Sequence, residues 1–308
     1  MMARIKVRRT NREELPGVAL LRDAVAAETG FRVGGPQTLD LDMELDPTLA
    51  HLMGHDPDGF VSALNRDETV GFGAAHVRSR QWVLSELWVL SQHRGTGAGE
   101  ALLERLLLYG ERSGAREYLA VVPDAGSIVA LLVRHDFRSL TPVYELRISR
   151  EKAEKLGTAL SRLLPGQDVT QELLERRGQA DLDRIDKLTR RLVREADHVF
   201  WLKTLGLNAW FIRQGSRIAG YGYGGRSQIG PIAGTTQEAA LAALGFAFGA
   251  ALERSLRQSL EVRIPAAFDA GVQALLDGGA VLEGVLSLYG RGSLPSFDRY
   301  VLGTVNLP

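Results

Sequence analysis

The chain has 308 residues, which is enough for two domains of ordinary size, each with a core of its own. Its 37 basic and 37 acidic residues cancel, which argues against a nucleic acid or an anionic membrane attracted by overall charge. The absence of cysteine excludes disulfides, thiolate metal sites and a covalent cysteine mechanism.

Targeting and metal signals are weak in this sequence. Residues 1–10 are basic but lack the apolar run of a signal peptide, and no segment reaches the roughly 18 apolar residues of a membrane span. His51 and His55 are four positions apart, but Gly54 and Pro57 interrupt the helix that would align them. We therefore expect a cytoplasmic protein with no membrane partner and no metal site.

The first half of the chain alternates strands and helices. A strand is expected at 5–8, and Asn11 begins a helix that runs to about residue 29. Residues 31–58 are rich in glycine, proline and aspartate, with a short helix at 47–53, and we expect a substrate lid there. Strands at 60–64 and 70–77 form a hairpin. The remaining elements are expected as a strand at 82–90, a helix from 98, a strand at 118–122, a helix at 125–134 and a strand at 143–148.

The segment from Leu87 to Glu104 joins an apolar strand, a polar turn, a glycine loop and a helix. Gly95, Gly97 and Gly99 allow positive φ angles and bring bare N–H groups close to a ligand. The helix that starts near Ala98 adds unpaired N–H donors and the positive end of its dipole. This combination predicts a binding site for a phosphate or a pyrophosphate.

The spacing of the glycines narrows the choice of phosphate-containing ligand. A Walker loop would end in Gly-Lys-Ser/Thr, but Glu100 follows Gly99. A dinucleotide fingerprint would place its third glycine at position 100, although Asp124 keeps this interpretation open as a ribose-binding acid.

The pattern Arg94-x-x-Gly97-x-Gly99 resembles the acyl-CoA loop of the GNAT N-acetyltransferase superfamily, and the resemblance extends over about residues 5–148. It implies a mixed α/β fold in which the strand before the loop splays from its neighbour, with free backbone groups that pair with the pantetheine arm. It also implies acetyl-CoA as cosubstrate. The cofactor-binding residues implied by position are Leu87, Trp88, Val89, Arg94, Gly95, Thr96, Gly97, Ala98, Gly99, Glu100 and Ser127.

Direct acetylation of an amine needs a base and a proton donor for the departing thiolate. Glu86 is the candidate base because it lies among apolar residues on the strand that enters the loop, where burial would raise its pKa; a solvent-facing strand carboxylate is the equal alternative. Leu132 stands where many GNAT enzymes have a catalytic tyrosine. Tyr144, Tyr118 or water is then left as the proton donor.

The same stretch departs from the family at two further positions. Ser127 replaces the usual asparagine, and Asp136 replaces the usual glycine. We therefore carry two hypotheses: an N-acetyltransferase acting on a primary amine of a small molecule, and a non-catalytic CoA-binding or ligand-binding regulatory protein.

The second half repeats the order of the first, which predicts two tandem GNAT-like domains. We expect domains at 1–150 and 167–308 joined by a linker at 151–166. The predicted elements of the second half are helices at 180–194, 236–257 and 267–276, and strands at 210–212, 218–223, 228–232, 260–264, 282–289 and 300–305.

The second copy lacks the glycine loop. Pro231 donates no N–H, no arginine starts the corresponding turn, and the paired glycines are missing. One acetyl-CoA per chain is therefore expected. Four roles stay open for this half: it could shape an acceptor pocket, bind an effector, form a homodimer or act as a structural brace.

Overall fold

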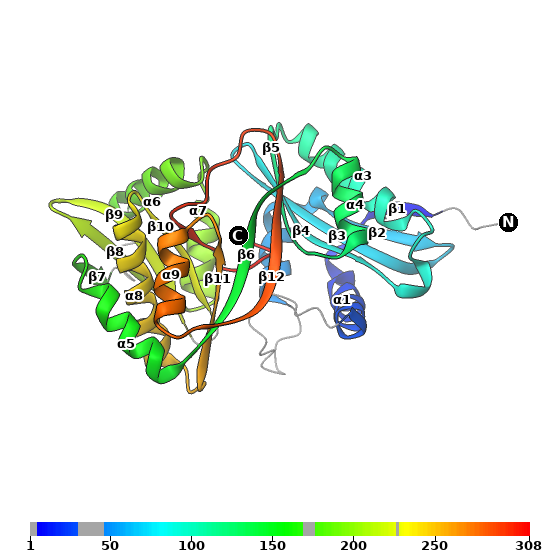
Figure 1. The fold of residues 1–308 in the computed structure, drawn as a ribbon. Helices are drawn as coiled ribbons and strands as arrows, with labels where there is room; N and C mark the ends of the chain where they lie inside the picture. The colour runs from blue at the N-terminus through cyan, green and yellow to red at the C-terminus, as the bar shows by residue number, and fades with distance from the viewer. Residues whose placement is uncertain (1–4, 30–45, 169–175, 226–227) are drawn as a thin grey trace. The chain divides into compact units, whose positions relative to one another are not determined.

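The computed structural model of the chain describes residues 5–29, 46–168, 176–225 and 228–308 (Figure 1). The chain divides into two compact units. Unit 1 is built mainly from residues 1–138 together with Gly290–Gly292, and unit 2 mainly from residues 139–289 and 293–306. The boundary between the units thus precedes the expected position at residue 150. Part of the expected lid, residues 31–45, lies outside the described residues.

Unit 1 follows the predicted order of elements. The first helical segment begins after Asn11 as predicted, because the backbone N–H and the side chain of Asn11 form a capping box with Glu14. The elements of unit 1 are β1 (Lys6–Arg9), η1 (Arg12–Glu14), α1 (Leu15–Thr29), α2 (Pro47–His55), η2 (Pro57–Gly59), β2 (Phe60–Asn65), β3 (Glu68–Arg78), β4 (Gln81–Val89), η3 (Ser91–His93), α3 (Ala98–Arg112), β5 (Glu117–Pro123) and α4 (Gly126–Arg134).

The strands of unit 1 lie in the order β1-β2-β3-β4-β5, with β4 and β5 parallel and the other pairs antiparallel. One face of the sheet packs on α3, where glycines make room for the helix: a Cβ on Gly71 or Gly73 would lie 3.1 or 2.9 Å from leucine side chains of α3. Because side chains alternate along a strand, Phe72 and Ala74 face the opposite side, which α1 contacts. The sheet is therefore mixed and covered on both faces, which confirms the predicted α/β class.

Unit 2 also keeps the predicted rhythm. Its elements are β6 (Arg138–Ser149), α5 (Arg150–Ser161), β7 (Gly166–Asp168), α6 (Arg176–Thr189), α7 (Glu195–Val199), the π-helical turn η5 (Phe200–Thr204), β8 (Asn208–Gln214), β9 (Arg217–Gly224), β10 (Ile229–Gly234), α8 (Gln237–Arg254), β11 (Ser259–Pro265), α9 (Asp269–Asp277), β12 (Val281–Arg291) and β13 (Tyr300–Val301). The strands lie in two groups, β13-β10-β9-β8-β7 and β12-β6-β11.

The residues expected to form a linker are instead largely a packed helix of unit 2. Ala153, Gly157 and Leu160 of α5 are buried, and Gly157 lies so close to α8 that a Cβ there would be 3.1 Å from Phe248. The charged residues that suggested a linker are on the solvent side of α5. Other boundaries differ as well: β6 begins at Arg138 rather than at residue 143, α6 ends at Thr189 rather than at residue 194, and the last strand is shorter than 300–305.

Among the described residues, no helix combines the length and apolar character that crossing a bilayer requires. The same residues contain no group of three or more His, Asp or Glu side chains placed to hold a metal ion.

Candidate functional site

Strands β4 and β5 begin as a ladder and then separate. Their parallel register runs from Gln81 opposite Glu117 to Leu84 opposite Ala120, and no further pair joins them among the described residues although both strands continue. At the same point a bulge places Ser85 as an extra residue between Leu84 and Glu86 relative to β3. Among the described residues, the second half of β4 therefore has one edge paired with β3 and no strand paired along the other edge, which we name the open edge.

The alternation of antiparallel pairs decides which main-chain groups reach this open edge. Leu90 N–H donates to the carbonyl of Val70 in β3 at 3.0 Å. Main-chain groups that face the same neighbour recur at every second residue of an antiparallel strand, so Trp88 also directs its main-chain groups toward β3. Leu87 and Val89 consequently direct their main-chain groups toward the open edge. Of the three residues expected to pair with a pantetheine arm, the geometry favours these two.

The glycine loop follows the open edge and has the predicted backbone. Gly95 and Gly97 have φ angles of 76° and 89°, which side-chain-bearing residues rarely adopt, and a Cβ on either would meet no atom within 4 Å. Gly97 is the N-cap of α3, and no side chain caps the helix. The first turn of a helix leaves its N–H groups without helical acceptors. Ala98, Gly99 and Glu100 therefore carry N–H groups without helical acceptors next to the bare backbone of Gly97, which is a geometry that fits a pyrophosphate.

The side chain of Glu100 contacts two residues at the end of α4. Its carboxylate lies 2.8 Å from His135 Nε2 and 3.4 Å from Arg134 Nη1. These contacts partly offset the negative charge of Glu100, which would otherwise repel an anionic ligand at the first turn of α3. Arg94 and Thr96 are exposed in the loop, and Ser127 is exposed in the first turn of α4.

Glu86 lies on the α1 face of the sheet and is only 3 % exposed. It is opposite Ala74 on β3, and its carboxylate accepts a hydrogen bond from the indole N–H of Trp88. Arg22 of α1 approaches the other carboxylate oxygen at 3.8 Å. Of the two alternatives expected from sequence, the structure has the inward-facing carboxylate, because the bulge at Ser85 resets the alternation of β4.

Burial raises the pKa of Glu86 to about 7, although Arg22 and Trp88 favour the ionised form. The charge of Arg22 is shared, since its guanidinium also binds Asp46 at 2.7 Å and Asp23 at 2.9 Å. A carboxylate with this pKa exchanges protons near neutral pH, as a general base must.

Sequence reasoning missed Arg22 and the bulge. Arg22 lies within the apolar stripe of α1, between Val18 and Val25, and a charged residue at such a position is the signal that should have marked it. The bulge is accompanied by a buried pair, in which Ser85 Oγ lies 2.8 Å from His76 Nδ1. No spacing pattern in β4 announces this extra residue.

The comparison with known families agrees with this geometry. Residues 28–137 match the sequence model of the Acetyltransferase (GNAT) family. This range contains β4, the glycine loop, α3, β5 and α4. This part of the chain is therefore similar to the GNAT family.

Solved structures with the same fold extend the likeness to the whole chain. A protein from Pyrococcus horikoshii that is provisionally named an acetyltransferase matches with a TM-score of 0.73 at 14% identity, over 99% of this chain and 96% of its own. A GCN5-related N-acetyltransferase from Sphaerobacter thermophilus gives 0.58 at 14% identity, over 95% and 98%. A tandem GNAT protein from the clavulanic acid biosynthesis pathway gives 0.57 at 12%, over 94% and 98%. At such identities the likeness concerns the fold. No curated protein matches the sequence.

The position of the usual GNAT tyrosine holds no phenol. Leu132 of α4 is fully buried. Asp136, which stands where GNAT proteins often have glycine, has a φ of 65° and so adopts the conformation that a glycine would adopt more readily. The departure at this position thus changes the residue but keeps the backbone.

The two tyrosines considered as replacements are both packed. Tyr118 is 5 % exposed, and its ring packs against Trp82 and Phe137 at the start of β5. Tyr144 lies on β6 in unit 2, opposite Ile264, where it is half-buried against the apolar core of that unit. These surroundings favour packing roles for both residues.

Proposed function

We propose that unit 1 is an N-acetyltransferase that transfers the acetyl group of acetyl-CoA to a primary amine of a small molecule by direct attack. One observation carries this proposal: β4 bears a buried carboxylate with a pKa near 7, then an open main-chain edge, and then an uncapped helix N-terminus. Each of these features supplies one requirement of amine acetylation.

Acetyl-CoA would supply the activated acetyl group as its thioester. The N–H groups of the glycine loop and of the first turn of α3 would bind its pyrophosphate, with Arg94 as the adjacent cation. Leu87 and Val89 would bind the pantetheine arm through their main chains. The positive φ angles of Gly95 and Gly97 keep the loop backbone bare where these phosphates would lie.

Glu86 would act on the acceptor. Its carboxylate removes a proton from the substrate ammonium, which leaves a neutral amine with a lone pair that can attack the thioester carbonyl. Arg22 then stabilises the ionised form of Glu86. The guanidinium of Arg22 also contacts Asp46 and Asp23. The three carboxylates exceed the single guanidinium in charge, which supports a cationic acceptor.

The departing thiolate needs a proton, and the described part of unit 1 offers no exposed phenol in α4 for it. We propose solvent water as the donor. Tyr144 stays a prediction as the alternative acid, and a Tyr144→Phe variant tests it: a large fall in turnover with unchanged stability would support Tyr144, and unchanged turnover would leave water.

The remaining expectations belong to the same proposal. We propose a cytoplasmic protein that acts on a soluble amine, with neither a nucleic acid nor a membrane as partner. We also propose that the chain forms a homodimer, which sedimentation velocity would test.

The second hypothesis is a non-catalytic CoA-binding GNAT-like protein, and the buried Leu132 favours it, because the usual proton donor is replaced. Thiol release from acetyl-CoA over a panel of small amines separates the two. Amine-dependent release of one CoA per acetylated product supports the enzyme. Saturable acetyl-CoA binding without release by any amine supports the regulatory protein, and no binding contradicts both.

A further inference from the structure

Unit 2 repeats the arrangement strand, helix, strand that forms the open edge in unit 1. In chain order β10, α8 and β11 correspond to β4, α3 and β5. In unit 1 the two strands share a ladder before they separate, but in unit 2 they are not paired at all: β10 lies beside β9 and β13, and β11 lies beside β6. The edge of β10 that faces away from β9 is therefore the counterpart of the open edge of β4.

Residues 299–302, which we name the 299–302 segment, cover this edge. Ile232 and Ala233 of β10 pair with Val301 and Tyr300. Gly234 N–H donates to the Arg299 carbonyl at 3.2 Å. On its other side the segment reaches β11, where Leu302 N–H donates to the Arg263 carbonyl at 3.0 Å. The segment thus lies between β10 and β11. It pairs with the main-chain groups of β10 that correspond to the unpaired groups of β4 in unit 1.

The fit between the segment and β10 is close. A Cβ on Gly230 would lie 2.6 Å from the carbonyl oxygen of Leu302. One of the first N–H groups of α8 is also capped within the chain, because the Thr236 side chain accepts from Ala239 N–H at 3.1 Å. Arg299 adds a hydrogen bond from its guanidinium to the Thr235 carbonyl at 2.6 Å. The loop before α8 therefore differs from the loop before α3, which has no side-chain cap.

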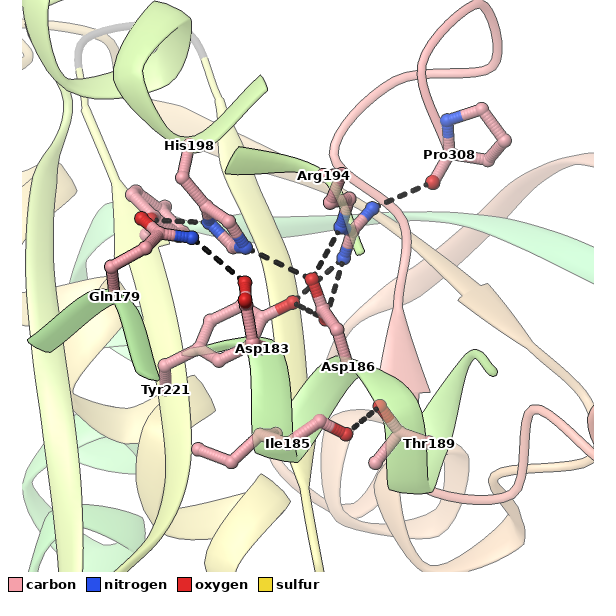
Figure 2. A network of polar contacts seen from close by, with 10 residues as sticks. Gln179, Asp183, Ile185, Asp186, Thr189, Arg194, His198, Tyr221 and Pro308 are labelled. Carbon is pink, nitrogen blue, oxygen red and sulfur yellow. Dashed lines mark hydrogen bonds and ion pairs between the residues drawn. The ribbon is translucent and has the colours of Figure 1, made fainter. Parts of the chain in front are cut away.

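A buried polar network holds the segment from the side of α6 and α7. Figure 2 shows Arg194, His198 and Tyr221 directed at the carboxylate of Asp186. Arg194 Nη1 also donates to the main-chain oxygen of Pro308 at 3.0 Å. These groups lie in the interior, with exposed fractions of 3 % or less.

Tyr300 connects the network to the segment. Its ring is fully buried, and the guanidinium carbons of Arg190 and Arg194 lie 4.4 and 5.4 Å from the ring centroid. Cation–π contacts of this kind are strongest when both partners are desolvated. The cations of the network are therefore engaged in holding the segment in place.

We propose that the 299–302 segment is a built-in occupant of the acyl-CoA groove of unit 2, added as a strand where unit 1 leaves its edge open for a pantetheine arm. Unit 2 is consequently closed to acyl-CoA. This inference goes beyond the proposed function and does not depend on whether unit 1 is catalytic.

The absence of cysteine in the chain allows a direct test on the full-length protein. Val301→Cys places a small thiol at a fully buried position of the segment, and Ser296→Cys places one at an exposed position nearby as the matched control. We expect Ellman's reagent to label Val301→Cys at least about 100-fold more slowly than Ser296→Cys under native conditions, and at the same rate in urea. Equal native rates would overturn the proposal.

A second arm distinguishes this proposal from the proposed function. Excess acetyl-CoA is added to the Val301→Cys protein, with and without Gly97→Trp to block the loop of unit 1. We expect unchanged labelling in both proteins, and calorimetry should give no more than one site per chain. Faster labelling of Val301→Cys with acetyl-CoA, or two sites, would refute the occupied groove. No site at all would refute acetyl-CoA binding by unit 1 and leave the labelling result standing.

Discussion

Glu86→Gln provides a test in which stability and activity should change in opposite directions. The pKa of Glu86 is about 7 against an ordinary value of 4.5, because burial disfavours its charge. Each pKa unit corresponds to about 1.36 kcal/mol, so ionising Glu86 destabilises the folded chain by about 3 kcal/mol. The raised pKa means that stability is full below pH 4.5 and is lost as the pH rises through 7.

Glutamine cannot ionise, so the variant escapes this loss. We expect the difference in unfolding free energy between variant and wild type to shift by about 3 kcal/mol in favour of the variant between pH 4.5 and pH 8. Urea unfolding at the two pH values measures it. Glu104→Gln, at an exposed position of α3, is the matched control and should show no such shift.

Activity should fall in the same variant. Removal of a general base typically lowers the rate by about 10²- to 10⁴-fold, and the wild-type kcat/KM should rise with pH through about 7 as Glu86 ionises. Turnover by Glu86→Gln equal to wild type at neutral pH would show that Glu86 is not the base. A pH-independent stability difference would show that its pKa is not raised.

Two further variants test other parts of the account. Asp136→Gly should raise the unfolding free energy by about 1 kcal/mol in urea, because glycine relieves the positive φ of 65°, and a destabilised variant would contradict this reasoning. Asp186→Asn should lower it by about 3 to 5 kcal/mol at neutral pH, since the change leaves Arg194 and His198 buried without their carboxylate. The charge of Arg194 and the hydrogen bond with His198 hold the pKa of Asp186 well below its ordinary range against the effect of burial. Wild-type stability should therefore fall below about pH 4, and the variant should lose this acid-dependent part.

The sequence predicted the local structure of unit 1 well, because strong hydrophobic periodicity and turn residues define its elements. The helix start at Asn11, the hairpin between β2 and β3, and the positive φ angles of Gly95 and Gly97 all have short-range causes. The backbone of the glycine loop was predictable for the same reason, because it depends on contiguous residues.

The features that the sequence did not predict depend on contacts between distant residues. The orientation of Glu86 depends on a bulge at Ser85, and its pKa depends on burial next to Arg22, which comes from a helix far away in the chain. Segment 150–161 is a charged sequence that only its packing against α8 identifies as part of unit 2. The strand addition by residues 300 and 301 likewise requires knowledge of the partner strand.

Acetyl-CoA titration of a matched pair of variants tests the central claim most directly. Gly97 and Gly114 flank α3, both are exposed with φ angles of 89° and 76°, and a Cβ on either meets no atom within 4 Å. Tryptophan at each position should therefore impose a similar backbone strain of roughly 1 to 2 kcal/mol.

We expect calorimetry to show one acetyl-CoA site per chain in wild type and in Gly114→Trp, and at least about 100-fold weaker binding in Gly97→Trp, where the side chain fills the space above the first turn of α3. Equal affinity of the two variants would contradict the placement of acyl-CoA at the glycine loop.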